Sequence, residues 1–393
     1  APSDLKQNKL SKQNQLAEIN NSGKAYIIYK SKKCFDLYTN FSKKIILNNK
    51  NIKNFLKKKY KYKTKKTDLL IGFFCFFLLN NLMNVKIPKQ KNVNFPKGIF
   101  YKPEKIINLT NNLRYKSAKV FRNNDFKINI NKDSYKKIFD KFKKKIKSGE
   151  TYQIKICTKY KTKSKINPLD FFSRLSKTNL APEAFMIKDK NYSIISCSPE
   201  NLITKKGSEI STKPIAGTVK KTKSLNKLKA LNYFKKNIKE TKEHNMIVDM
   251  ERNDLSKVCK IGSVKLSKQK IVEEYKDLFH YVSLIKGKLK KDIKNIDIIK
   301  AMMPGGSVIG CPKISTLNLL NKQEKENRNI YTGSFGYIKF NGDMRFNIII
   351  RSILNFKNFS EISVASGVVV DSNSNHEFNE NYIKAKALID LFK

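Results

Sequence analysis

The sequence has no tryptophan, only seven arginines and only 32 acidic residues among its 393. Lysine supplies nearly all of the 82 basic residues, and the formal net charge of +50 would by itself indicate a polyanionic partner such as nucleic acid. Nucleic-acid sites, however, favour arginine for bidentate contacts and stacking. Here lysine is spread along the whole chain with many asparagines and isoleucines, the residues of A/T-rich codons. We therefore attribute the charge to genome composition and expect no nucleic-acid partner.

Cysteine and histidine are too few and too scattered for a disulfide framework or a zinc site. The six cysteines contain no CxxC pair, and there are only three histidines. We interpret the cysteines as reduced thiols and expect a cytoplasmic protein. The sequence begins with Ala1 rather than methionine, so its start need not be that of the whole protein.

Long hydrophobic runs are also missing. The one membrane-like stretch, LLIGFFCFFLL at residues 69–79, is much shorter than the ~20 residues that cross a bilayer. It is internal and follows a basic segment, so it is not a signal peptide. We predict a buried strand there and no membrane association. With 40% hydrophobic residues, 25 of them phenylalanine alone, the chain can form a large core, which excludes whole-chain disorder.

The apolar pattern predicts a mixture of helices and strands without the βαβ rhythm of a parallel sheet, so an α+β fold. The first 65 residues are weakly periodic, with edge strands expected at 25–29 and 45–47. Predicted helices are 133–146, 168–176, 224–248, 295–303, 314–321 and 376–392. Predicted strands are 152–158, 184–187, 193–196, 202–204, 333–340, 346–355 and 361–370.

Two pairs of glutamates stand out in a chain with few acids. Glu240 and Glu243 lie three residues apart in one predicted helix, as do Glu377 and Glu380 in the last one. This spacing puts each pair on one helical face. If the pairs face each other they need a hard cation between them, and Mg²⁺ suits an oxygen-rich site. The alternative, that both pairs are solvated helix faces, stays open. Lys384, one turn after Glu380, is placed to meet an anionic group.

Two glycine-bearing loops and one histidine are weaker signals. Residues 213–218 read KPIAGT and residues 303–313 read MPGGSVIGCPK. Gly-Gly-Ser before a helix exposes backbone N–H groups and a hydroxyl, which can hold a carboxylate. The second loop does not fit the Walker pattern. His280 lies in an apolar setting, where a lone histidine is usually a satisfied core residue.

Eight segments occur in a recognisable order: SPEN (198–201), PIAGT (214–218), KEHNMIVDMERNDL (242–255), FHYVS (279–283), PGGSVIGCPK (304–313), NIYTGSFGY (329–337), RFNIIIRS (345–352) and SGVVVDS (366–372). Together these motifs resemble the chorismate-utilising enzymes, a family that includes the large subunits of anthranilate synthase and aminodeoxychorismate synthase and also isochorismate and salicylate synthases. The resemblance covers 126–393, with a fainter match back to residue 22. It implies an α/β sandwich of two large antiparallel β-sheets with helices on the outside. In that fold, 1–125 would be a diverged, shortened N-terminal segment contributing strands, and 126–393 the catalytic region.

The resemblance also implies a magnesium site. Glu243 and Glu380 would be the Mg²⁺ ligands that grip the ring carboxylate of chorismate through the metal. Glu240 and Glu377 would form a second acidic layer that binds through water or moves protons. Lys384 matches the family's lysine on the carboxylate side.

Further roles follow from the resemblance on the substrate side. Arg351 and Tyr331 would hold the enolpyruvyl carboxylate, with help from the backbone at Gly367. Ser307 stands where the family has threonine or serine close to the ring. His280 corresponds to the histidine placed near the leaving group and its protons.

Two positions discriminate within the family. Gln153 replaces the lysine base of the water-adding members, so the nucleophile should be ammonia from a glutamine amidotransferase partner. Ala216, followed by Gly217 and Thr218 in the predicted substrate-binding loop, replaces the nucleophilic lysine of many aminodeoxychorismate synthases, which favours direct attack as in anthranilate synthase. The flanking residues resemble the para-aminobenzoate branch instead. The predicted activity is therefore Mg²⁺-dependent synthesis of anthranilate, the alternative is aminodeoxychorismate synthase component I, and a remote alternative is an inactive basic relative that binds polyanions.

Overall fold

Eighteen strands and the helices around them make up the described part of the protein. The computed structural model describes residues 2–31, 34–57, 63–83, 85, 95–110, 113, 115, 117, 125–179, 181–275 and 278–393. The helices are α1 (Pro2–Asn21), α2 (Ile52–Leu56), α3 (Phe76–Leu82), α4 (Lys132–Lys147), α5 (Pro168–Thr178), α6 (Lys227–Lys236), α7 (Ile238–Ser256), α8 (Asn295–Met302), α9 (Lys313–Gln323) and α10 (Ser374–Ile389).

The strands follow the chain from near its start to the last helix. They are β1 (Tyr26–Ser31), β2 (Cys34–Ile46), β3 (Leu69–Phe74), β4 (Gly98–Asn108), β5 (Lys127–Ile128), β6 (Gln153–Lys163), β7 (Phe185–Lys188), β8 (Tyr192–Ser196), β9 (Asn201–Lys206), β10 (Glu209–Lys213), β11 (Ile215–Lys220), β12 (Lys265–Glu274), β13 (Leu278–Lys288), β14 (Gly310–Cys311), β15 (Ser334–Lys339), β16 (Met344–Asn347), β17 (Ser352–Phe356) and β18 (Phe359–Val368).

All described strand pairs are antiparallel and form one open ladder that packs against itself as a sandwich. One half runs β6–β18–β17–β8–β7 and the other β3–β15–β16–β9–β10–β13. Strands β1, β2 and β4 join the halves at one edge. Side chains from β1, β7 and β8 pack against β3 and β15 in one apolar cluster, so the core lies between the halves. The predicted α+β sandwich is confirmed.

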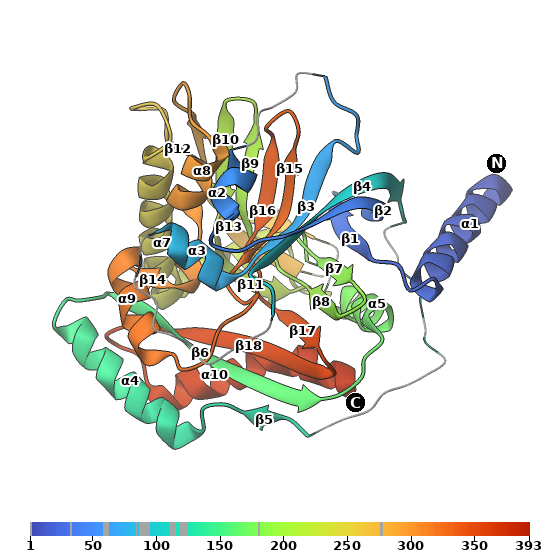
Figure 1. Ribbon diagram of the computed structural model, residues 1–393. Coiled ribbons are helices and arrows are strands. Elements are labelled where there is room, and N and C mark those ends of the chain that lie inside the picture. The colour runs from blue at the N-terminus through green and yellow to red at the C-terminus, as the bar shows by residue number, and fades with distance from the viewer. Residues whose placement is uncertain are drawn as a thin grey trace.

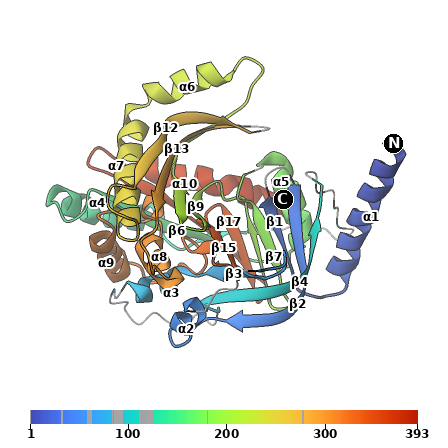
Figure 2. The same cartoon turned by 90° about the horizontal axis from the view of Figure 1, so that it is seen from above.

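Helices cover the outside of the strands (Figure 1). In Figure 2, α6 and α7 lie against the outer side of β12 and β13, and α1 extends away from the body of the molecule. None of the described helices is long and apolar enough to cross a membrane. Helix α4 shows why the periodic segments were predictable, because its buried residues recur every three or four positions. They are Tyr135, Phe139, Phe142 and Ile146.

The structure corrects four predicted elements. Residues 69–79 form β3 only as far as Phe74 and then turn into α3. The predicted helix 224–248 is divided at Asn237, whose side chain accepts a hydrogen bond from the backbone N–H of Glu240 and so caps α7. The predicted strand 346–355 is interrupted at Arg351, which has a positive φ of 51°. The predicted loop 213–218 contains the start of β11, which pairs with β13.

Candidate active site

A pocket of about 420 Å³ collects most of the residues that the sequence singled out. Strands β6, β11 and β18, helices α7 and α10, and the loop before α9 all contribute to its lining. We call it the acidic pocket. The predicted residues that line it are Ala216, Gly217, Thr218, Glu240, Glu243, Ser307, Tyr331, Arg351, Glu380 and Lys384.

Glu243, in the middle of α7, is the most strongly hydrogen-bonded carboxylate in this pocket. Its Oε1 accepts hydrogen bonds from Gln153 Nε2 at 2.5 Å and from Lys155 Nζ at 2.8 Å. Burial acts to raise the pKa of Glu243, but Lys155 and Gln153 outweigh it and hold the pKa at about 2. The group is therefore a carboxylate at any physiological pH.

Glu380 and Glu240 complete the acidic cluster. Glu380, on α10, pairs with Lys384 Nζ at 3.1 Å. Burial acts against ionisation of Glu380, but Lys384 lowers its pKa. For Glu240, burial and then the charges of Glu243 and Glu380 raise the pKa. Three carboxyl groups are thus close enough to repel one another, and this oxygen donor set fits a hard divalent cation such as Mg²⁺.

Glu377 lies behind this cluster rather than in the pocket wall. Its side chain is buried on α10 and accepts a hydrogen bond from Lys239 Nζ at 3.1 Å. The side chains of His376, Glu377 and Glu380 also bring one potential ligand atom each to within 4.8 Å of one another. Because His376 is exposed, this second group opens towards solvent.

Arg351 and Tyr331 bring a cation and a phenol to the same pocket. No ion-pair partner for the Arg351 guanidinium occurs in the described part of the chain, although the side chain is accessible from the pocket. Its left-handed backbone, φ 51°, is rare for a residue with a side chain and interrupts the strand between β16 and β17. An unpaired guanidinium held in this way fits a carboxylate of a ligand.

Small residues keep the pocket open where Cβ atoms would fill it. A Cβ at Gly367 would lie 2.7 Å from Gln153 Nε2, 2.8 Å from Lys155 Nζ and 3.2 Å from Glu243 Oε1. The missing side chain therefore gives these three groups room to meet. At Gly217 a Cβ would lie 2.9 Å from the ring of Phe234.

His280 lies outside the acidic pocket. It is buried on β13, opposite Thr218 of β11, and lines a neighbouring hollow of about 100 Å³. Pro199 and Ile215 line both hollows, so they form the wall between them. Burial, followed by the charge of Arg351, lowers the pKa of His280 to about 4, so its imidazole is neutral at physiological pH.

The comparisons with known proteins agree with these motifs and with this fold. A family model described as chorismate binding enzyme matches residues 11–390. The chain belongs to the chorismate binding enzyme family. Aminodeoxychorismate synthase component 1 of Bacillus subtilis is 35% identical over 257 residues, 65% of this chain and 55% of that protein. Anthranilate synthase component 1 of Buchnera aphidicola is 32% identical over 376 residues, 90% of this chain and 68% of that protein.

A solved structure supports the fold. Anthranilate synthase component I from Streptococcus pneumoniae superposes with a TM-score of 0.74, at 24% identity, over 93% of this chain and 90% of that one. The chain spans only about half the length of several curated relatives that it matches.

Two residues of the acidic pocket were missed by the sequence reasoning. Lys155 follows Gln153 by two positions, and the alternation of a strand puts both side chains on one face of β6. Glu200 belongs to the quoted SPEN motif and lies beside Ser307 in the pocket lining. Burial raises the pKa of Glu200 to about 7. In the described part of the chain, Glu200 Oε1 and Ser307 Oγ are buried without a hydrogen-bond partner, so both atoms can serve a ligand.

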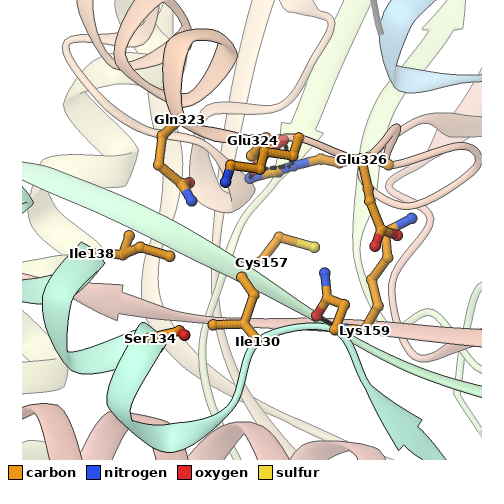
Figure 3. A pocket seen from close by; sticks show the side chains of 11 residues that line it. Ile130, Ser134, Ile138, Cys157, Lys159, Gln323, Glu324 and Glu326 are labelled. Atoms are coloured by element: carbon orange, nitrogen blue, oxygen red, sulfur yellow. Dashed lines mark hydrogen bonds and ion pairs between the residues drawn. The ribbon is translucent and has the colours of Figure 1, made fainter. Parts of the chain in front are cut away.

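A second pocket, of about 230 Å³, lies further along β6. Figure 3 shows Cys157 and Lys159 facing it, with Gln323 and Glu324 on the opposite side. Lys159 Nζ pairs with Glu361 at 2.7 Å, and the buried Arg328 pairs with Glu324 at 2.6 Å. Its buried charges are therefore already matched within the protein.

Proposed function

We propose that this protein is a chorismate-aminating subunit that needs Mg²⁺, takes ammonia from a glutamine amidotransferase partner and then eliminates pyruvate to give anthranilate. The observation that carries the proposal is that one pocket holds both a carboxylate cluster around Glu243 and the unpaired guanidinium of Arg351. Chorismate has two carboxylates, one on the ring and one on the enolpyruvyl arm. A cation held by acids and a free arginine supply a partner for each.

In this proposal Glu243 and Glu380 would hold the metal, and Glu240, beside them in the pocket, and Glu377, behind the cluster, would form the second acidic layer. Bound Mg²⁺ would polarise the ring carboxylate and stabilise charge that develops on it. Arg351 and Tyr331 would hold the enolpyruvyl carboxylate. The substrate is then fixed at both ends, which orients the ring carbon towards incoming ammonia.

Glu200 is the proton donor that we assign to the leaving hydroxyl. Its pKa of about 7 leaves a substantial protonated fraction at neutral pH. As ammonia forms the new C–N bond and the C–O bond breaks, the hydroxyl takes the proton of Glu200 and departs as water. The Glu200 carboxylate then accepts a proton from the new ammonium group, so the residue returns to its first state.

The later elimination of pyruvate is the step that we assign to His280. A neutral imidazole can take the ring proton that must leave when the aromatic ring forms. Because Pro199 and Ile215 separate His280 from the acidic pocket, this role requires the imidazole to reach past that wall.

Ammonia is proposed as the nucleophile because the amide of Gln153 cannot deprotonate water. Ala216 brings no amine to the pocket, so ammonia would attack the ring directly. A second candidate function is aminodeoxychorismate synthase component I, favoured by the 35% identity with the Bacillus subtilis protein of that name. That activity would stop at 4-amino-4-deoxychorismate without release of pyruvate.

The test is a product assay of the purified protein with chorismate, Mg²⁺ and an ammonium salt, which replaces the partner. We expect fluorescent anthranilate and an equal amount of pyruvate. Formation of 4-amino-4-deoxychorismate without pyruvate would select the second function. Isochorismate as the product would contradict amination altogether. An absence of turnover together with salt-sensitive retention on DNA would favour the inactive polyanion-binding alternative.

A further inference from the structure

Two lysines, not one, reach the acidic centre of the pocket. Lys384 Nζ lies 3.1 Å from Glu380, and its side chain is 38% exposed. Lys155 Nζ lies 2.8 Å from Glu243 Oε1, and its side chain is only 13% exposed. The ammonium of Lys155 therefore pairs with the carboxylate that is proposed to bind metal. This contact is strong because the pair is partly shielded from water.

The two hydrogen bonds leave Glu243 Oε1 with little capacity to bind a further donor or a metal ion. A carboxylate oxygen has two lone-pair sites, and Gln153 Nε2 and Lys155 Nζ both donate to this one atom. A metal ion that uses Oε1 must replace one of these donors. Gln153 is 1% exposed and has a short side chain, whereas Lys155 has a long and flexible one. Lys155 is thus the donor that can leave.

The sheet holds the base of Lys155 in place while its end stays free to move. Lys155 on β6 lies opposite Gly367 on β18, where the missing Cβ leaves room for the ammonium. The carbonyl of Lys155 accepts a hydrogen bond from Arg328 at 3.2 Å. The ammonium can therefore move within the pocket although the backbone is fixed.

We propose that Lys155 is a tethered cation that competes with Mg²⁺ for Glu243 and, when displaced, binds the anionic substrate. The same lysine would then weaken metal binding in the substrate-free protein and strengthen binding of chorismate. The metal half needs only the acidic site, whereas the substrate half rests on the function proposed above.

The direct test compares wild type with Lys155→Met by isothermal titration with Mg²⁺ alone and, separately, with chorismate in the presence of EDTA. We expect Mg²⁺ to bind about tenfold more tightly to the variant, because the loss of one charge-assisted contact is worth about that factor. Chorismate should bind about tenfold more weakly. Lys155→Arg keeps the cation and should keep both affinities within about threefold of wild type, well inside one tenfold step.

Lys161→Met is the matched control, because Lys161 lies on the same strand and pairs with Glu326 away from the acidic pocket. It should change neither affinity. Weaker or unchanged Mg²⁺ binding by Lys155→Met would overturn the proposal, since it would mean that Lys155 merely supports Glu243. The proposal would also be overturned if Lys155→Met and Lys155→Arg lost affinity for chorismate to the same extent.

A measurement on the wild-type protein covers the case in which the methionine variant does not fold. Reductive methylation followed by peptide mass spectrometry reports the reactivity of Lys155. Added Mg²⁺ should increase its labelling, and chorismate should then decrease it; labelling that Mg²⁺ does not change overturns the proposal. If the metal measurements turn out as expected but chorismate is not aminated, the proposed function fails while the competition at Glu243 stands.

Discussion

Strand β6 borders two pockets that are built from similar residues but differ in how their charges are matched. In the second pocket the buried Lys159 and Arg328 each have a carboxylate within 2.7 Å. In the acidic pocket Glu200, Glu240 and Arg351 have no ion-pair partner within the described residues. Glu200 Oε1 and Ser307 Oγ also lack a hydrogen-bond partner there, whereas no described residue of the second pocket has a buried unpartnered polar atom.

From this difference we infer which charges serve the fold and which are available to a ligand. Burial of a charge costs several kcal/mol unless the group is paired, so a stable protein matches its buried charges internally. The second pocket obeys this rule. The acidic pocket departs from it, because the carboxyl groups of Glu200 and Glu240 and the guanidinium of Arg351 have no ion-pair partner among the described residues. Variants made in matched pairs, one in each pocket, can break or sharpen this contrast.

The largest effect is expected from Glu243→Gln. The amide keeps the shape but removes the charge, so Mg²⁺-dependent turnover of chorismate should fall at least about 1,000-fold. Its counterpart in the second pocket is Glu361→Gln, which removes the partner of Lys159. That variant should keep turnover within about threefold and lower the free energy of unfolding instead. If Glu243→Gln still shows Mg²⁺-dependent activity, the metal assignment is wrong.

Glu200→Gln comes next, with an expected fall in kcat of about 100-fold, the size of a typical proton-donor contribution. The wild-type rate should decline above about pH 7 as Glu200 loses its proton, and the variant should lack this decline. A pH–rate profile of each protein checks both points. A variant that keeps the wild-type profile would remove Glu200 from the proton transfer.

The same residue gives a stability prediction of defined sign. The pKa of Glu200 rises from 4.5 to about 7 on folding, so the folded protein binds more protons than the unfolded chain between these values. Wild-type stability therefore falls as pH rises through that window, by at most about 3 kcal/mol. Glu200→Gln removes this loss and should raise the Tm relative to wild type at pH 8 but not at pH 4. Thermal unfolding at the two pH values measures the difference.

Much of the fold could be predicted because the elements with one buried face carry a regular pattern. Helix α4 and the strands β7, β8 and β18 lie within a few residues of their predicted positions. Strand β12 was missed, because most of its side chains are exposed or only partly buried and no alternation marks it. The division between α6 and α7 was missed as well, since it depends on the side chain of Asn237 capping α7 rather than on hydrophobicity.

Part of the candidate site could be predicted from motifs and residue spacing, whereas the burial of individual side chains could not. Pairs of glutamates three residues apart on α7 and α10 predicted the acidic cluster, and the structure brings Glu240, Glu243 and Glu380 into one pocket. Lys155 could not be found in this way, because one more lysine in a chain with 82 basic residues reads as surface. Only the pairing of β6 with β18 reveals that it faces Glu243.

The next largest effect on turnover is expected from a pair of arginine variants, one in each pocket. Arg351→Met removes the unpaired guanidinium and should raise the KM for chorismate about 30-fold, the value of a charge-assisted contact, with little change in stability. Arg328→Met removes the fully buried guanidinium that pairs with Glu324, and breaking such a buried ion pair should cost about 3–5 kcal/mol in urea unfolding. Steady-state kinetics and unfolding curves of both variants are the measurements. A large stability loss in Arg351→Met would mean that its guanidinium is structural.

The smallest effect is expected at Cys157, which faces the second pocket only one strand repeat from Lys155 (Figure 3). Burial raises the pKa of this thiol to about 12, so the thiolate that reacts with electrophiles is scarce at neutral pH. Cys157→Ala should therefore leave turnover within about twofold, and iodoacetamide should label Cys157 slowly in the folded protein and rapidly in urea. This substitution removes a small side chain from a pocket whose charges remain paired, and it removes no contact with a ligand. A fall in turnover of tenfold or more would show that the second pocket takes part in the reaction, and the contrast between matched and unmatched charges would no longer separate the site from the fold.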